Sequence, residues 1–383
     1  MRGSWGLKSL FFTLKSKLMN APKKPRIGIT IGDINGIGME VIMKALSENR
    51  FNTLCTPIIF GSAKWLAKYK KTFGYDFAYH QFNYWQENSV NPHKINVFNC
   101  CADKNVDIEF GKVTPQGGKA ALESLQAAVQ ALQAKRIEAL VTAPINKSNI
   151  QSDKFKFAGH TEFFTQKFNT AESLMFLVSE TLRVGVLTGH IPLAEVPKCV
   201  NREKIIQKVE IMVHSLRYDF GIEKPKIAIL GLNPHAGEEG LLGREELEII
   251  NPTIEELRQK GLLIYGSYPA DGFFGKQLHK KFDGILGMYH DQGLIPFKTL
   301  AFHNGVNFTA GLPIIRTSPD HGTAYDIAGK NIASEESMVA SILLALEVYR
   351  NRQKGEDLET LKKEKKQRDL QRKHRPDSTY LEE

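Results

Sequence analysis

The chain has 383 residues, of which 42% are hydrophobic and 24% are charged, with 31 glycines and 16 prolines. This is the composition of a globular protein, and it excludes a chain disordered throughout, a collagen and a coiled coil. The formal net charge is +9, but residues 1–26 alone hold seven Lys or Arg and no acid. The rest of the chain is therefore close to neutral, which does not support a basic domain that binds nucleic acid.

Residues 1–25 form a basic N-terminal extension that we expect to be disordered. Its apolar run, 9–14, is too short for a secretory signal, and Lys15 closes it. No stretch of the chain reaches the ~18 consecutive apolar residues of a membrane span, so no membrane association is expected. Met19 directly precedes the segment NAPKKP, which leads into the first predicted strand, and this leaves both Met1 and Met19 as candidate start residues.

From Arg26 onward, short apolar runs alternate with amphipathic stretches, which is the pattern of βα units. We therefore predict an α/β fold with mostly parallel sheets flanked by helices. At this length, two core-bearing lobes are expected within a catalytic unit at 26–352. The predicted strands are 26–31, 56–61, 95–98, 139–142, 184–188, 226–232, 284–288 and 306–309. The predicted helices are 118–134, 245–260 and 334–349.

The last segment of the chain, 353–383, holds nine Lys or Arg and eight Asp or Glu with few apolar residues. This composition predicts a solvated helix that runs into a disordered end. A role in binding a partner is the alternative interpretation.

The cysteines indicate a reducing compartment. The four of them, Cys55, Cys100, Cys101 and Cys199, include no CxxC pair. Neither a disulfide framework nor a cysteine zinc site fits this pattern. A cytoplasmic location is therefore expected.

The glycine-rich segment 32–38, GDINGIG, links the first predicted strand to a helix. Its glycines are spaced GxxxGxG rather than GxGxxG, so it lacks the Rossmann dinucleotide fingerprint and predicts only a tight turn. The chain also has no GxxxxGK[ST] phosphate loop. It has no GxSxG motif, so a serine nucleophile of the α/β-hydrolase type has no support.

Three histidines follow the ends of predicted strands. His190 follows VGVLTG, His235 follows KIAILGLNP, and His290 follows GILGMY. Ligands bind at the edge of an open α/β sheet where the strands end. The three imidazoles are therefore candidate ligands of a divalent metal with positions left open for substrate. Their spacing matches no local metal motif, and hydrogen-bonded loop histidines are the alternative.

Three cations also follow predicted strands or apolar segments. Lys147 follows VTAPIN, Lys298 follows IPF, and Arg316 follows GLPII. An arginine binds a phosphate or carboxylate through two parallel hydrogen bonds, and a lysine adds a point charge. These residues are candidates for an anion-binding site, with ordinary surface charge as the alternative.

Seven strings occur in order within the segment from Ile27 to about Leu346: GITIGDINGIGMEV, VTAPINK, FAGHTEFF, LTGHIPLAEVP, LGLNPHAGEEG, MYHDQGLIPFK and GVNFTAGLPIIRTSPDHGTAYDIAG. Together they resemble the 4-hydroxythreonine-4-phosphate dehydrogenases of vitamin B6 biosynthesis. This resemblance implies an NAD-dependent decarboxylating dehydrogenase with the two-lobed fold of isocitrate and isopropylmalate dehydrogenases. It also implies a homodimer whose active site draws on both subunits.

The resemblance implies roles for individual residues. It assigns metal binding to His190, His235 and His290, with zinc expected and magnesium, cobalt or manganese as alternatives. It assigns substrate binding to His160, Thr161, Lys298, Asn307 and Arg316. The string HGTAYDIAG resembles the loop that binds the adenosine of NAD in the isopropylmalate enzymes. That likeness assigns cofactor binding to His321, Gly322, Thr323, Ala324 and Asp326.

The implied substrate is 4-phosphooxy-L-threonine, a phosphorylated hydroxy acid. Its oxidation gives a 3-keto acid that decarboxylates to 3-amino-2-oxopropyl phosphate. Lys147 is the predicted general base, with Asp271 and Asp291 as alternatives. Two strings depart from the family pattern: TPGDPAGIG reads TIGDINGIG, and TGPVHK reads TAPINK, which puts Asn146 where the family has a histidine.

Three other functions remain open on the sequence. The first is oxidation of a four-carbon sugar-acid 4-phosphate, threonate or erythronate, by the same fold. The second is a metal hydrolase, since three histidines with an open position also activate water. The third is a binding protein that acts through the basic N-terminal arm.

Overall fold

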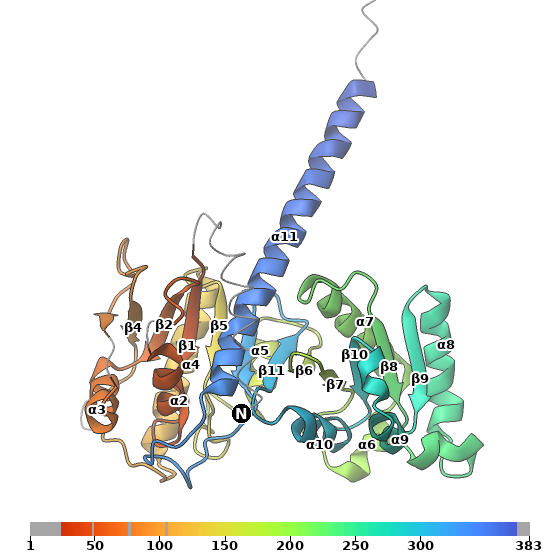
Figure 1. Cartoon of the computed structure of the whole chain (residues 1–383), viewed down its shortest axis with the longest axis horizontal. Coiled ribbons are helices and arrows are strands. Elements are labelled where there is room, and N and C mark those ends of the chain that lie inside the picture. The colour runs from red at the N-terminus through yellow and green to blue at the C-terminus, as the bar shows by residue number, and fades with distance from the viewer. Residues whose placement is uncertain (1–23, 48–49, 76–77, 104–105, 374–383) are drawn as a thin grey trace, which may run out of the picture.

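The computed structural model describes residues 24–47, 50–75, 78–103 and 106–373 (Figure 1). The predictions of disorder for most of the N-terminal extension and for the last ten residues lie outside these ranges. The element labels below are those of Figure 1.

In the described part of the chain, twelve strands form one sheet in the order β3-β4-β2-β1-β5-β12-β11-β6-β7-β10-β8-β9. The strands are β1 (Arg26–Thr30), β2 (Thr56–Gly61), β3 (Tyr79–Phe82), β4 (Ile95–Asn99), β5 (Ala139–Thr142), β6 (Leu174–Val178), β7 (Arg183–Val186), β8 (Lys226–Leu230), β9 (Leu263–Tyr268), β10 (Gly284–Gly287), β11 (Val306–Ala310) and β12 (Arg316–Pro319). All eight predicted strands are present.

The sheet is mostly parallel, as predicted. Among the strands that the structure describes, only the pairs β12–β11, β11–β6 and β6–β7, at the centre of the sheet, are antiparallel. Because of these reversals, the strands from β3 to β12 run one way and those from β7 to β9 run the other way. The loops that follow one set of strands therefore leave the sheet in the opposite direction to the loops that follow the other set.

Helices flank both ends of the sheet (Figure 1). The α-helices are α2 (Gly38–Leu46), α3 (Ala63–Phe73), α4 (Pro115–Gln133), α5 (His160–Lys167), α6 (Val196–Cys199), α7 (Arg202–Tyr218), α8 (Asn251–Gln259), α9 (Ala270–Gly275), α10 (His290–Ala301) and α11 (Glu336–Lys373). The shorter turns are η2 (Leu193–Glu195), η3 (Pro234–Gly240), the π-helical η4 (Glu246–Ile250) and η5 (Leu278–Lys281). Thr114 begins α4 by accepting a hydrogen bond from Gly117 N, and Asn201 begins α7 by accepting one from Lys204 N.

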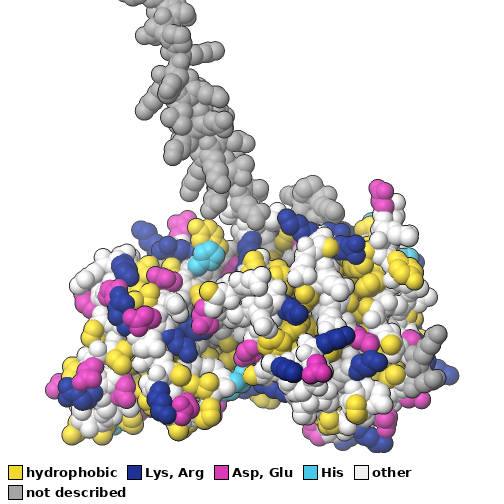
Figure 2. Space-filling view, turned by 180° about the vertical axis from the view of Figure 1, so that it is seen from behind, with side chains coloured by type: hydrophobic (Ala, Val, Ile, Leu, Met, Phe, Trp, Pro, Cys, Tyr) yellow, Lys and Arg dark blue, Asp and Glu magenta, His cyan; other side chains and the backbone are white. Residues whose placement is uncertain are grey.

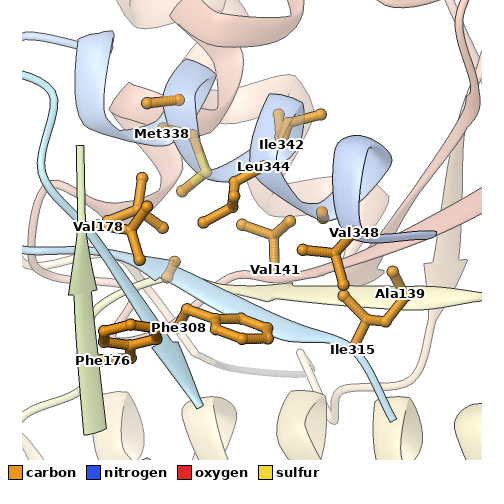
Figure 3. Packing of buried hydrophobic residues seen from close by; sticks show 14 of the residues in the cluster. Ala139, Val141, Phe176, Val178, Phe308, Ile315, Met338, Ile342, Leu344 and Val348 are labelled. Carbon is orange, nitrogen blue, oxygen red and sulfur yellow. The ribbon is translucent and has the colours of Figure 1, made fainter. Parts of the chain in front are cut away.

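The first turns of α11 cover the centre of the sheet. Met338, Ile342 and Val348 are buried against the central strands, on which Phe176 and Phe308 lie (Figure 3). Burying such a side chain contributes about 1.5–3 kcal/mol, so this contact fixes α11 to the strands that carry the site. Beyond it, α11 leaves the body of the molecule (Figure 1).

The surface carries charges of both signs. Figure 2 shows Lys and Arg side chains interspersed with Asp and Glu over one face of the molecule. Among the helices of the described ranges, none is both long enough and apolar enough to span a membrane.

Candidate active site

A pocket of about 290 Å³ lies where the loops of the two oppositely directed strand sets meet. Ten of the residues singled out in the sequence line it. They are Lys147, His160, Thr161, His190, His290, Lys298, Asn307, Arg316, His321 and Gly322.

The local structure explains why these side chains meet. Lys147 follows the end of β5, and His160 opens α5. His190 and His290 follow β7 and β10, which are adjacent parallel strands, so both imidazoles leave the sheet at one edge. Arg316 opens β12, next to β5. The structure therefore brings together Lys147, His190 and His290, which the sequence places after strand ends, and their roles in the site stay predictions.

His190 and His290 form a pair whose ring centroids are 5.4 Å apart. Nδ1 of His190 lies 3.4 Å from Oε1 of Glu162, and Nδ1 of His290 lies 2.7 Å from Oδ1 of Asp291. In proteins, a carboxylate on Nδ1 orients an imidazole so that Nε2 faces a ligand. Asp291 therefore orients His290, and this role does not favour Asp291 as the general base.

Lys147 lies beside the histidine pair. Its Nζ is 3.4 Å from Nε2 of His190. The preceding Asn146 accepts hydrogen bonds through Oδ1 from the backbone N–H groups of Ser148 and Asn149, at 2.9 and 3.1 Å. This local turn holds Lys147 at the pocket, so Asn146 has a structural role here.

Arg316 is the most deeply buried cation of the pocket, with 2% of its surface exposed. Nε and Nη2 donate to the hydroxyl of Thr142 at 3.1 and 2.7 Å, and Nη1 donates to Thr309 at 3.2 Å. Burial lowers the pKa of Arg316 to about 9, which leaves it charged at neutral pH. A buried charge that bonds only hydroxyls is suited to a bound anion.

Four buried polar atoms of the pocket have no hydrogen-bond partner among the residues that the structure describes. They are Nε2 of His160, Oε2 of Glu162, Oδ1 of Asn307 and Nε2 of His321. Buried polar atoms are normally paired, so a group of them in one pocket indicates a ligand site. Burial, together with the charges of Arg316 and Lys147, holds the pKa of His160 well below its usual value, so its ring is neutral.

A third cation of the pocket, Lys298, lies on α10 with Nζ 3.6 Å from Oδ1 of Asp320. Burial raises the pKa of Asp320, and Lys298 partly offsets this effect. Because Asp320 also lines the pocket, it limits the positive charge that Lys298 and Arg316 bring together there.

His235 and Asp271 lie outside this pocket. His235 is exposed on η3, where it lines a separate hollow with Glu238 and Glu246. Asp271 is exposed on α9. No group of three or more His, Cys, Asp or Glu that could hold a metal ion occurs within the ranges that the structure covers. The three-histidine site is not assembled within one chain and stays a prediction.

The expected cofactor segment is only partly in the pocket. His321 and Gly322 line it, whereas Thr323, Ala324 and Asp326 do not. Instead, the carbonyl oxygen of Thr323 accepts a hydrogen bond of 2.9 Å from the backbone N–H of Ile37, on the glycine-rich turn. The segment therefore runs from the pocket to that turn.

Among the lining residues that the sequence did not single out are Thr142, Glu162 and Asp320. Thr142 ends a predicted strand. Glu162 follows His160 and Thr161 in the string GHTEFF, and Asp320 directly precedes His321. Their nearness to predicted site residues was the only signal, because their contacts are with residues distant in the chain.

Comparison with known proteins gives consistent matches. Residues 53–345 match the family described as pyridoxal phosphate biosynthetic protein PdxA. A 4-hydroxythreonine-4-phosphate dehydrogenase of Bacteroides thetaiotaomicron is 50% identical over 332 residues, which is 86% of this chain and 90% of that protein. A protein of Oceanobacillus iheyensis, named as a candidate D-threonate 4-phosphate dehydrogenase, is 39% identical over 85% of this chain and 98% of its own length.

Solved structures show the same likeness. The crystal structure of 4-hydroxythreonine-4-phosphate dehydrogenase from Klebsiella pneumoniae superposes with a TM-score of 0.74 at 35% identity. The match covers 85% of this chain and 100% of that chain. A terephthalate 1,2-cis-dihydrodiol dehydrogenase from Burkholderia xenovorans superposes less closely, with a TM-score of 0.58 at 25% identity, over 85% of this chain and 98% of that chain.

Proposed function

The chain belongs to the family of the pyridoxal phosphate biosynthetic protein PdxA, and on this basis we propose that it is a 4-hydroxythreonine-4-phosphate dehydrogenase of vitamin B6 biosynthesis. It oxidises 4-phosphooxy-L-threonine with NAD and a divalent metal ion. The observation that carries this proposal is the buried Arg316 in a pocket with unpartnered polar atoms. Because the named relatives are dehydrogenases, the metal hydrolase is set aside.

The phosphate and carboxylate of the substrate bind to the cationic side of the pocket. Arg316 offers a planar fork of N–H donors, and Lys298 adds a point charge. Asn307, His160 and Thr161 supply further polar contacts to the same molecule. These residues orient the substrate, which favours reaction by holding it in the productive geometry.

The chemistry removes two hydrogens from the substrate. When bound, NAD supplies the hydride acceptor and the metal ion supplies a Lewis acid that stabilises negative charge on the substrate oxygen. Lys147 takes the proton of the C3 hydroxyl, and the carbinol carbon becomes a carbonyl. The carboxylate is then β to a carbonyl, so CO2 leaves and its bonding electrons pass into that carbonyl as an enolate. A proton added at C2 then gives the amino ketone phosphate. If Lys147→Met keeps turnover within a few-fold of wild type, Lys147 is not the base.

The donor set of the pocket fits a divalent metal ion in part. We propose His190 and His290 as two ligands, because each has a carboxylate on Nδ1 and the two rings are adjacent. His235 is the proposed third ligand. Imidazole ligands suit zinc, with cobalt, manganese or magnesium as alternatives.

A second copy of the chain supplies the missing ligand in this proposal. Exposed apolar side chains follow each of the three histidines along the chain, and exposed apolar surface is a feature of protein interfaces. They are Ile191 and Leu193, Leu241 and Leu247, and Ile295 and Phe302. We therefore propose a homodimer in which His235 of one copy completes the site of the other.

We propose that the segment 321–329 would hold NAD. His321 and Gly322, which line the pocket, would contact the part of the cofactor nearest the substrate, and Thr323, Ala324 and Asp326 would hold its adenosine. Burial lowers the pKa of His321, which favours a neutral ring beside the cofactor.

For the catalytic unit, we keep the boundaries that the sequence predicts. We propose 26–352 as the catalytic unit, with the pocket between its two lobes, because the family match falls inside it. All four cysteines are free, which suits the proposed cytoplasmic location.

A sugar-acid 4-phosphate is the second candidate substrate, favoured by the relative from Oceanobacillus iheyensis. The two substrates differ by an amine or a hydroxyl at C2. Rates of NADH formation, measured side by side with 4-phosphooxy-L-threonine and with threonate 4-phosphate, decide between them. We expect the higher kcat/KM with 4-phosphooxy-L-threonine. A higher value with threonate 4-phosphate would move the enzyme out of vitamin B6 synthesis.

A further inference from the structure

Asp33, in the glycine-rich turn after β1, is a fully buried carboxylate that the proposed mechanism does not use. Its Oδ1 accepts a hydrogen bond of 2.9 Å from the backbone N–H of Asn35. Its Oδ2 accepts two more, from Nδ2 of Asn149 at 2.7 Å and from the hydroxyl of Tyr325 at 3.0 Å. Hydrogen bonds to a buried charged acceptor are among the stronger ones in proteins.

These two donors come from the two sides of the proposed reaction. Tyr325 belongs to the segment 321–329, over which we place NAD. Asn149 belongs to the turn that carries Lys147, the proposed base, and it also donates to the carbonyl oxygen of Thr114. One carboxylate oxygen therefore ties the cofactor segment to the base-bearing turn.

The backbone around Asp33 is shaped for this contact. A Cβ on Gly36 would lie 2.7 Å from the carbonyl oxygen of Thr323, at the point where Ile37 N–H bonds the same oxygen. A Cβ on Gly117 would lie 2.8 Å from both carboxylate oxygens of Asp33. Glycines let these segments approach closely. The glycine-rich turn 32–38 therefore packs directly against the segment 321–329.

We propose that Asp33 is a positioning residue that fixes the segment 321–329, and with it NAD, relative to the turn that carries Lys147. This inference rests on the proposed function, since it takes NAD to bind along that segment. Burial and the neighbouring Asp33 raise the pKa of Tyr325, so its phenol stays protonated and donates to the carboxylate.

The test is NAD affinity measured by calorimetric titration of the full chain. Asp33→Asn leaves an amide whose single oxygen cannot accept all three hydrogen bonds, and we expect the Kd for NAD to rise about tenfold, the equivalent of one strong hydrogen bond. Tyr325→Phe removes one donor and should raise the Kd in the same direction by a smaller factor. The KM for NAD should follow, with a smaller change in the KM for the phosphorylated substrate.

Tyr79→Phe is the matched control, because its hydroxyl bonds the carbonyl oxygen of Ala63, away from the turn. It should bind NAD as wild type does. A purely structural role for Asp33 would lower the melting temperature of its variant and leave the Kd of the folded protein unchanged. Should Asp33→Asn fail to fold, Tyr325→Phe decides alone.

The outcomes separate this inference from the proposed function. If wild type binds NAD and both variants bind it equally well, the inference is overturned and the proposed function stands. If wild type binds no NAD, the cofactor assignment fails and takes the inference with it.

Discussion

Arg316 shows at the scale of one residue how function and stability oppose each other in this pocket. Its guanidinium is buried against Thr142, Thr309 and the ring of Phe164. Desolvating a charge costs free energy that hydroxyl partners only partly return. We therefore interpret Arg316 as a residue whose burial lowers stability and whose function is to bind an anion.

The variant Arg316→Met should lose substrate binding without losing stability. We expect the KM for 4-phosphooxy-L-threonine to rise about 100-fold, since a two-bond contact to an anion is lost. The melting temperature should hold or increase, because an apolar side chain replaces a buried charge. Arg202→Met, at an exposed arginine paired with Glu256, is the control and should change neither quantity. An unchanged KM would contradict the anion-binding role.

His160 should make the folded state sensitive to acid. Burial, Arg316 and Lys147 lower its folded pKa below the unfolded value, so the unfolded chain binds this proton more readily. The contribution of neutral His160 to the free energy of unfolding is therefore intact above the unfolded pKa of about 6.5. It is lost as pH falls toward the folded pKa, by up to about 1.4 kcal/mol per pH unit. Urea unfolding of wild type and His160→Gln between neutral and mildly acidic pH measures this. Equal slopes for both proteins would contradict it.

At the scale of elements, the sequence pattern predicted eight strands because each is a short apolar run between helical stretches. β12 was missed because RTSP is polar and ends in proline, and it becomes a strand only through pairing with β5 and β11. The positions of His190 and His290 followed from strand ends. The place of His235 did not, because η3 has left-handed backbone angles at five successive residues, 235–239, which no periodicity reports.

The helix α11 has a buried part and a projecting part, and truncations should distinguish them. Ending the chain after Arg352 keeps the contact of its Nε with Oδ1 of Asp219 at 2.7 Å, a carboxylate that is 1% exposed. We expect activity and melting temperature close to those of the full chain. Ending it after Asn351 leaves that carboxylate without its ion pair and should cost about 3–5 kcal/mol in the free energy of unfolding. Equal stabilities of the two truncated chains would contradict this account.

At the scale of the whole molecule, the pocket of one chain holds only two of the three proposed metal ligands. If the site is shared, His190→Ala and His235→Ala are each inactive alone. When the two variants are mixed in equal amounts under conditions that exchange subunits, about half of the dimers contain one copy of each. Each mixed dimer has one intact site of two, so about a quarter of wild-type activity should return. A mixture that stays inactive although mixed dimers form would contradict the shared site.

The most direct measurement is NADH formation, followed by absorbance, when 4-phosphooxy-L-threonine is added to the full chain with NAD. We predict NADH formation that stops on addition of a chelator and returns when zinc or another divalent metal is restored. Formation of NADH that a chelator leaves unchanged would contradict the metal site. No NADH with metal present would contradict the proposed reaction itself.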